Sequence, residues 1–184
     1  MPVTHAPLAE ILDALDGERG ADAALQRIDA FRRRIVGAGV FSIQRNVTTA
    51  DDPPDEIRLC RFYSSEGQHY PVNGSKRKTL TPWTECLFVR GRVFVGEGPD
   101  ALAHHFDDYA QMRPWNLQSV VNVPLMRGNV CYATFNVFGT RPHWQPQEVL
   151  GIRMLALAAM RWVPAAPDLD YRFPSVSHTD SMEA

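Results

Sequence analysis

The stretch SVVNVPLMRGNVCYATFNVF, residues 119–138, constrains the fold of this chain more than any other segment. It consists of two runs of apolar, β-branched and aromatic residues, which favour strands, around the turn residues Arg127-Gly128-Asn129. This pattern predicts an antiparallel β-hairpin. Each predicted strand also carries one amide, Asn122 in the first and Asn136 in the second.

The length of the hairpin loop decides which face of the sheet receives these amides, because side chains alternate along a strand. A three-residue loop places Asn122 beside Thr134, on the same face as Asn136. A two-residue loop, Gly128-Asn129, places Asn122 on the face of Phe135 instead. We expect the three-residue loop, in which a ligand, water or a helix must satisfy the amides, because an unpaired buried amide costs about 1 to 3 kcal/mol.

The rest of the chain alternates between helical and strand patterns. We expect helices at residues 7–15, 21–36, from Thr81 onward, 100–111 and 146–163, and strands at 40–44, 57–65 and 93–95. Residues 66–79 read as a long polar connection. In the strand at 57–65, alternation places Arg61 and Tyr63 on one face. The order of elements predicts an α+β domain with one antiparallel sheet and helices packed on it.

Charge and composition exclude several classes of protein. The net charge of −2 argues against general binding to nucleic acid or a membrane surface, which requires a basic excess. The chain contains no apolar run long enough for a transmembrane helix and no secretory signal pattern. Its three cysteines lack metal or redox spacing, so we expect reduced thiols in a cytoplasmic protein. The run Arg32-Arg33-Arg34 is interpreted as a solvated helix end.

The hairpin and its flanking segments carry a family resemblance. The strand S-V-V-N-V-P-L from Ser119, the tight turn, the paired strand and the following helix with Glu148 together resemble a GAF domain, over about residues 21–163. More narrowly, the motifs R-F-Y-S-S from Arg61 and T-P-W from Thr81 resemble small, stand-alone bacterial GAF proteins. Residues 1–20 are then expected to form a short helix and linker, and residues 164–184 a disordered tail.

The resemblance implies a single-domain, PAS-like α+β fold, with a central antiparallel sheet flanked by helices. It also implies a homodimer formed through terminal helices and a ligand cavity between the sheet and the connecting helices. Members of this family bind cyclic nucleotides, bilins, haem, formate or amino-acid-like molecules, so the fold alone specifies no ligand. One departure is Ala133, at a hairpin position where these domains commonly carry glycine.

Our first hypothesis is a module that binds a small anionic or zwitterionic metabolite. Basic residues before a helix start and an arginine on a strand suit a carboxylate or phosphate, while aromatic residues can form an apolar wall. We predict contacts from Arg61, Tyr63, Tyr70, Lys76, Lys78, Trp83, Asn122, Thr134 and Asn136. The alternatives are that the lysines lie on a solvated loop, that the aromatic residues belong to the core, and that Arg61 pairs with Asp107 or Asp108.

Two other classes of function stay open. A small enzyme would draw a general acid or base from Glu97, Asp107 or Tyr63 in the same cavity. A dimeric interaction protein would leave the cavity inert. The resemblance also raises reduction of free methionine sulfoxide, but the glycine-rich, cysteine-bearing motifs of that branch are missing, and we interpret the cysteines as buried apolar side chains.

We predict no metal and no cofactor. The sequence H-H-F-D-D from His104 is the best metal candidate, because imidazole and carboxylate are common metal ligands. Adjacent residues diverge by about 100 degrees on a helix, so only His104 and Asp108 would lie on one side. Two ligands do not make a site.

Overall fold

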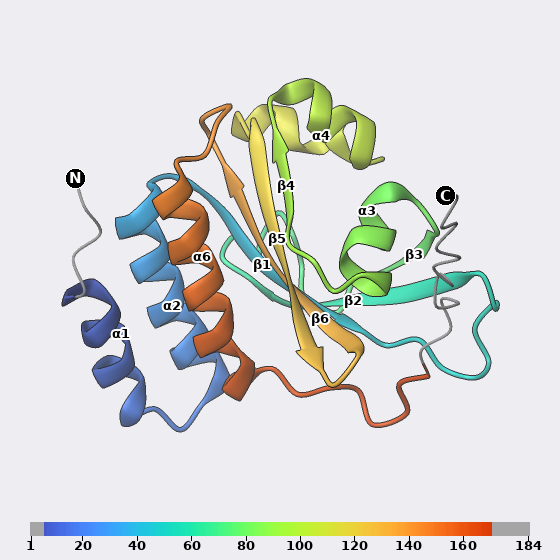
Figure 1. Cartoon of the computed structure of the whole chain (residues 1–184), viewed down its shortest axis with the longest axis horizontal. Helices are drawn as coiled ribbons and strands as arrows, with labels where there is room; N and C mark the ends of the chain where they lie inside the picture. Colours follow the sequence, from blue (N-terminus) through green and yellow to red (C-terminus); the bar gives the residue numbers. More distant parts are fainter. Residues whose placement is uncertain (1–5, 171–184) are drawn as a thin grey trace, which may run out of the picture.

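The computed structural model describes residues 6–170 and contains one antiparallel sheet of six strands (Figure 1). The strands lie in the order β3-β2-β1-β6-β5-β4. Their bounds are β1 Gly39–Asn46, β2 Glu56–Ser64, β3 Ser75–Thr79, β4 Phe94–Glu97, β5 Ser119–Arg127 and β6 Val130–Gly139. The predicted hairpin therefore forms at the centre of the domain as β5 and β6.

Helices cover both faces of this sheet (Figure 1). The helices α1 Ala6–Asp16, α2 Ala21–Val36 and α6 Pro146–Ala159 lie on one face, and a 3₁₀ turn, Met160–Trp162, extends α6. The opposite side carries α3 Pro82–Thr84, which continues as a π-helical turn over Glu85–Val89, then α4 Pro99–His105, α5 Tyr109–Met112 and a 3₁₀ turn, Arg113–Trp115. The predicted α+β architecture is confirmed.

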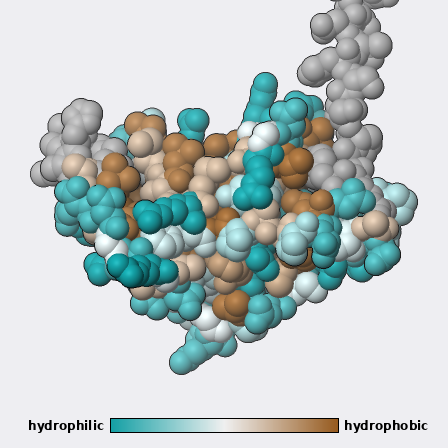
Figure 2. Space-filling model, turned by 90° about the horizontal axis from the view of Figure 1, so that it is seen from below, coloured by the Kyte–Doolittle hydropathy of each residue, from teal (hydrophilic) through white to brown (hydrophobic). Residues whose placement is uncertain are grey.

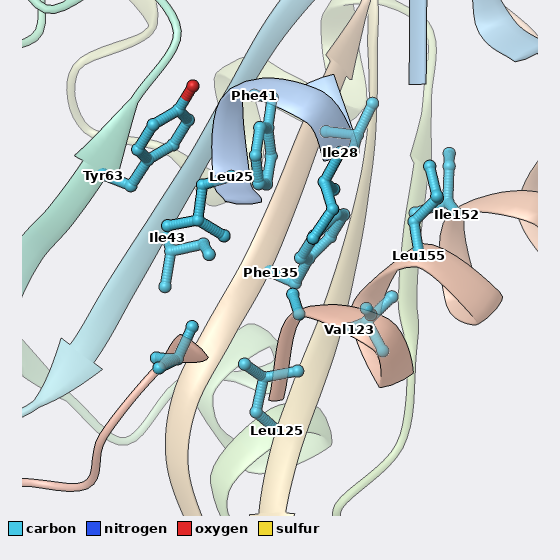
Figure 3. Packing of buried hydrophobic residues seen from close by; sticks show 14 of the residues in the cluster. Leu25, Ile28, Phe41, Ile43, Tyr63, Val123, Leu125, Phe135, Ile152 and Leu155 are labelled. Atoms are coloured by element: carbon cyan, nitrogen blue, oxygen red, sulfur yellow. The ribbon is translucent and has the colours of Figure 1, made fainter. Parts of the chain in front are cut away.

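The main hydrophobic core lies between the sheet and the α2–α6 layer (Figure 3). Leucine and isoleucine side chains of the two helices pack against aromatic and aliphatic residues of β1, β5 and β6. The rings of Phe41 and Phe135 lie 4.4 Å apart, and Tyr63 lies 5.2 Å from Phe41 on the same side. Burying each such side chain contributes about 1.5 to 3 kcal/mol, so this layer fixes the sheet against the helices.

Arg32 lies inside this layer, which corrects the prediction of a wholly solvated arginine run. Its side chain is 0% exposed, and its guanidinium donates hydrogen bonds to Asp29 at 2.6 and 2.9 Å and to the Gly37 carbonyl at 2.9 Å. Helical spacing places Arg32 on the inward face of α2, where the carboxylate compensates for the lost water. Arg33 and Arg34 are half exposed and pair with acids, as expected at a helix end.

The hairpin turn has two residues rather than the expected three. Arg127 pairs with Val130, which leaves only Gly128 and Asn129 in the loop. Gly128 has φ of 59°, a left-handed conformation that glycine adopts without steric cost.

A bulge nevertheless keeps the amides together. The register shifts between Leu125 and Met126, which adds one residue on β6. As a result Asn122 pairs directly with Asn136, not with Thr134 as predicted. The expectation that Asn122, Thr134 and Asn136 share one face is therefore met by a different register.

A second bulge, in β2, separates two residues that were predicted to share a face. Tyr63 pairs with Ile43 of β1, whereas Arg61 pairs with Gln44, so Phe62 has no partner on β1. The extra residue reverses the alternation, so Tyr63 points into the core beside Leu25 (Figure 3) while Arg61 faces the other side of the sheet. The predicted Arg61–Tyr63 clamp is wrong.

The predicted polar connection at residues 66–79 is wrong in its second half, because residues 75–79 form the edge strand β3. Its sequence S-K-R-K-T is charged, which protects an exposed sheet edge from pairing with another chain. Alternation along the strand directs Lys76 and Lys78 to one side and Arg77 to the other.

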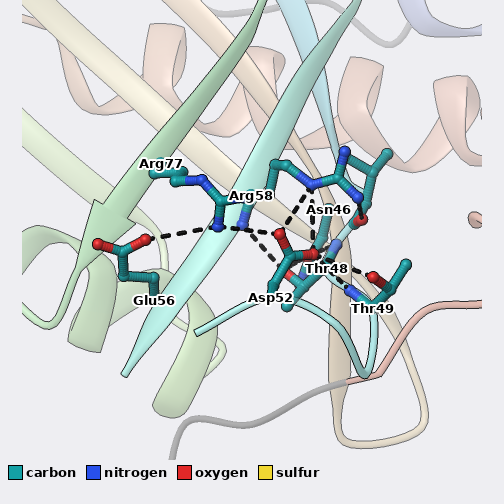
Figure 4. Close-up of polar contacts among 8 residues, drawn as sticks. Asn46, Thr48, Thr49, Asp52, Glu56, Arg58 and Arg77 are labelled. Carbon is teal, nitrogen blue, oxygen red and sulfur yellow. Dashed lines mark hydrogen bonds and ion pairs between the residues drawn. The ribbon is translucent and has the colours of Figure 1, made fainter. Parts of the chain in front are cut away.

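Arg77 anchors this edge strand (Figure 4). Its guanidinium lies 2.9 Å from the buried carboxylate of Asp52 and 3.5 Å from Glu56. Arg58 of β2 contacts the same Asp52 carboxylate, at 3.1 Å. The Asp52 carboxylate therefore ties β3 to β2, which holds the two lysines in position on the opposite side.

Other predicted elements differ from the observed ones at their boundaries. The predicted helix at residues 100–111 is interrupted at Phe106, so α4 and α5 are separate. Residues 164–170 pack partly against the core through Ala165 and Leu169, unlike the predicted exposed tail, and residues 171–184 lie outside the described residues. Ile11 and Leu15 of α1 also belong to the main core, so this helix packs as part of the domain.

The surface shown in Figure 2 mixes hydrophilic and hydrophobic residues, with brown residues set among teal ones. Within residues 6–170, no helix combines the length and the apolar character that crossing a bilayer requires.

We predict that Asp29→Asn lowers the free energy of unfolding by about 3 to 5 kcal/mol, because Arg32 is left as a buried cation without a carboxylate. Urea denaturation measures this change. Glu10→Gln is the matched control, since it also replaces an acid paired with an arginine of α2, here exposed Arg34 at 2.8 Å, and should leave the urea midpoint unchanged. Equal midpoints for the two variants would contradict the role of the buried pair.

We predict that Cys131 resists alkylation in the folded protein. Burial raises the pKa of its thiol to about 12, so the reactive thiolate is nearly absent at about pH 8. Cys60 and Cys86 are only half buried. Iodoacetamide followed by peptide mass spectrometry should label these two in native protein and all three cysteines in urea. Native labelling of Cys131 at the rate of Cys60 would contradict the prediction.

Candidate ligand-binding cavity

The floor of the cavity is a chain of three hydrogen-bonded side chains, Trp83 of α3, Asn122 of β5 and Asn136 of β6. The Trp83 indole Nε1 donates to Asn122 Oδ1 at 2.9 Å, and Asn122 Nδ2 donates to Asn136 Oδ1 at 2.7 Å. Asn136 Nδ2 then donates to the Thr134 carbonyl at 3.3 Å. All three side chains are buried.

Trp83 sets the direction of this chain, because an indole N–H can only donate. The Asn122 oxygen must therefore face Trp83, and each amide in turn presents its oxygen to the preceding donor. Each NH₂ group keeps a second hydrogen, since one is used within the chain. The floor consequently offers N–H donors to a group that carries acceptor oxygens.

Arg61 forms one wall. Its Nη1 donates to the Pro71 carbonyl at 3.2 Å, and its guanidinium lies 5.5 Å from the centre of the Tyr70 ring. The Nε atom is buried and has no hydrogen-bond partner among the described residues. Burial lowers the pKa of the Arg61 guanidinium, against the opposing effect of Asp108, as expected for a cation with too little compensating negative charge.

The rim carries two crossed ion pairs between β3 and the α4–α5 connection. Lys76 pairs with Asp108, and Lys78 pairs with Asp107 at 2.6 Å. Each lysine of the lining is thus compensated by a carboxylate, whereas Arg61 lines the cavity without a carboxylate partner among the described residues. This imbalance favours a negatively charged occupant.

The roof is aromatic. The Tyr70 hydroxyl donates to the Gln111 carbonyl at 3.3 Å, and its ring centre lies 6.2 Å from that of Trp115. Phe106 packs edge-on against Trp83, with ring centres 5.8 Å apart. The space enclosed between floor and roof is about 50 Å³, enough for a few water molecules or one small functional group.

Most residues predicted from the sequence meet at this cavity. Those that line it are Arg61, Tyr70, Lys76, Lys78, Trp83, Asn122 and Asn136. Thr134 shares the sheet face of the asparagines but is fully buried, and its hydroxyl has no hydrogen-bond partner among the described residues. Tyr63 lies in the core on the other side of the sheet.

The sequence prediction missed part of the lining. Ser42 and Gln44 come from β1, where alternation with buried Phe41 and Ile43 could have placed them on the opposite face. The remaining missed residues are Val40, Phe106, Asp108, Met112, Leu117 and Phe138. Most of these are apolar and carry no sequence signal that separates a cavity wall from core.

The three candidate acid–base residues are not brought together. Glu97 accepts a hydrogen bond from the Trp144 backbone at 2.8 Å, which holds the pKa of its carboxyl low and ties β4 to the connection before α6. Burial raises the pKa of Tyr63 to about 12, and its side chain faces the core. Asp107 lies outside the cavity, beyond Lys78.

The histidine pair is also not arranged for a metal. The helix α4 ends at His105, so His104 and Asp108 do not occupy successive turns as predicted. The carboxylate of Asp108 pairs with Lys76 instead. Among residues 6–170, no three His, Cys, Asp or Glu side chains gather in a geometry that could hold a metal ion.

Comparison with known proteins finds similarity only at the level of structure. No protein-family model matches the sequence. No curated protein sequence matches it either.

Several solved structures share the fold. The GAF domain of a phosphoenolpyruvate-protein phosphotransferase from Acinetobacter aligns over 88% of this chain and 93% of its own, with a TM-score of 0.61 at 13% identity. The chromophore-binding domain of the bacteriophytochrome RpBphP3 from R. palustris gives 0.59 at 8% identity, over 85% of this chain and 58% of that one. The far-red absorbing dark state of JSC1_58120g3, with bound biliverdin IXa, gives 0.57 at 13% identity, over 85% and 96%.

At 8 to 13% sequence identity, the TM-scores of 0.57 to 0.61 show that these three structures share the fold of this chain. The present chain spans just over half of the length of the bacteriophytochrome fragment and nearly all of the two shorter domains. The resemblance first noted in the hairpin therefore extends over 85 to 88% of the chain, and the chain has the GAF-domain fold.

Proposed function

We propose that this protein binds a small anionic or zwitterionic metabolite in the cavity on the Asn122–Asn136 floor. The observation that carries the proposal is the Arg61 guanidinium, whose buried Nε has no partner among the described residues. A planar carboxylate suits this group, because guanidinium presents its N–H donors in a fixed fork.

The floor supports the same class of ligand. The free N–H groups of Asn122 and Asn136 suit acceptor oxygens, and the carboxylate of Asp108 offers a partner to an ammonium group if the ligand is zwitterionic. The biliverdin-bound neighbour has a ligand in the same fold, which is consistent with a binding role for this one. Cytoplasmic location stays a prediction from the sequence.

The first test is native mass spectrometry of freshly purified protein, followed by thermal shifts across a panel of carboxylates and amino acids. A ligand at about 100 times its Kd should stabilise the folded state by about 2.7 kcal/mol. Arg61→Met should weaken the binding of any hit by roughly 10- to 100-fold, because a charge-assisted hydrogen bond is lost.

Arg90→Met is the matched control. Arg90 pairs with Glu85 at the surface and does not line the cavity. The Arg90→Met variant should therefore bind the hit with the affinity of the parent protein. A hit whose affinity is equally insensitive to Arg61→Met would place the ligand elsewhere, and a panel without any hit would count against the proposal.

We also propose that the protein forms a homodimer through its helical face. Leu150, Met154 and Leu157 are exposed on α6 although they are apolar. Their spacing places them on one side of the helix, where they can cover a second copy of the same surface.

We predict a dimer mass by size-exclusion chromatography with light scattering at micromolar concentration. The double variant Met154→Glu, Leu157→Glu should run as a monomer, because two charges in an apolar interface are not solvated. Leu80→Glu, which changes an exposed apolar residue between β3 and α3, on the other side of the sheet, is the control and should stay dimeric. A monomeric parent protein would contradict this assignment.

A further inference from the structure

A second hollow lies directly beside the cavity. It is formed by the end of β3, the start of α3 and the end of α4, and its volume is about 350 Å³. Lys78 and Trp83 line both spaces, so these two side chains form their shared boundary. We call the first space the inner cavity and the second the outer hollow.

The two volumes differ in what they can hold. Pockets for metabolite-sized ligands usually measure about 300 to 1,000 Å³. At about 50 Å³, the inner cavity accepts one end group of such a molecule, whereas the outer hollow has room for the remainder. A metabolite-sized ligand anchored on Arg61 would therefore extend past Lys78 and Trp83 into the outer hollow.

The outer hollow has the chemistry of an anion site. Its lining includes the cation Lys78, the imidazoles of His104 and His105, and the hydroxyl residues Thr79 and Thr81. Arg77 also borders the hollow, but its guanidinium is occupied by Asp52 and Glu56. One carboxylate, that of Asp107, is also present. Its side chain is 92% exposed, so its ion pair with Lys78 is the weak kind that an incoming anion can replace.

The boundary between the two spaces suits an apolar linker. The indole nitrogen of Trp83 is already bonded to Asn122, so the ring is held in place. Its remaining surface is aromatic and favours hydrocarbon or planar groups. A hydrophilic linker would find no free hydrogen-bonding group on this ring, because its only N–H is already bonded to Asn122.

We propose that the ligand is an elongated dianion, with one carboxylate on Arg61 and the asparagine floor, an apolar middle against Trp83, and a second anionic group in the outer hollow. This inference rests on the proposed function, since it assumes that the inner cavity binds the first carboxylate. The second group can be a carboxylate or a phosphate-like anion, because lysine and imidazole N–H groups can donate hydrogen bonds to either.

Isothermal titration calorimetry tests this with three series of increasing chain length: monocarboxylates, α,ω-dicarboxylates and ω-phosphonocarboxylates. We expect one or both dianion series to bind about ten-fold more tightly than the monocarboxylate of equal length, with a maximum at one length. The preferred series identifies the second anionic group.

Variants of the outer hollow supply the second measurement. The double variant His104→Gln, His105→Gln should reduce the ratio of dianion to monoanion affinity several-fold, because the affected groups contact only the far end of the ligand. Arg92→Gln, outside both spaces, should keep the parent ratio.

The outcomes separate the two proposals. Monocarboxylates that bind in an Arg61-dependent manner, with no advantage for either dianion series, would overturn the elongated ligand and leave the proposed function standing. A dianion preference that the histidine double variant leaves intact would overturn the assignment of the outer hollow. Binding of none of the three series would overturn this inference, and the same result together with no hit among the amino acids would overturn the proposed function as well.

Discussion

The hydrogen bond between Asn122 and Asn136 is the interaction on which the cavity depends. It joins the two central strands, and its donor and acceptor roles follow from Trp83 at the end of the chain. Without the bulge beside Met126, the two-residue turn would place these amides on opposite faces of the sheet. The extra residue in β6 thus lets the two buried amides form a hydrogen bond with each other, and each NH₂ group keeps one hydrogen for a ligand.

The same sheet separates two kinds of surface. The face toward α2 and α6 is packed with aliphatic and aromatic side chains and tolerates the Arg32 cation only because Asp29 neutralises it. The other face carries Arg61, Gln44 and the asparagines under a thin aromatic roof. The rigid core on one side holds the strand positions from which the polar side chains on the other side project.

Charge around the cavity is distributed by the edge strand. Asp52 secures Arg77 on one side of β3, so Lys76 and Lys78 project to the other side and reach Asp108 and Asp107. The first of these lysines serves only the inner cavity, whereas the second borders both spaces. An anionic ligand therefore meets a cationic rim in which the opposing carboxylates are partly exposed and replaceable.

The sequence by itself determined the α+β class, the central hairpin, the bounds of α2, the capped start at Thr81 and most of the polar lining, because periodicity and turn chemistry are local properties. Only the tertiary structure decided the facing of Tyr63, the pairing of the asparagines, the strand at residues 75–79 and the burial of Arg32. The two bulges are single-residue shifts in pairing between strands, and a shift of one residue reverses every side chain beyond it. β3 likewise depends on partners distant in space, namely β2 and Asp52, so no local pattern could specify it. Helical spacing allows Arg32 to face inward, but its burial depends on the packed interior of the domain.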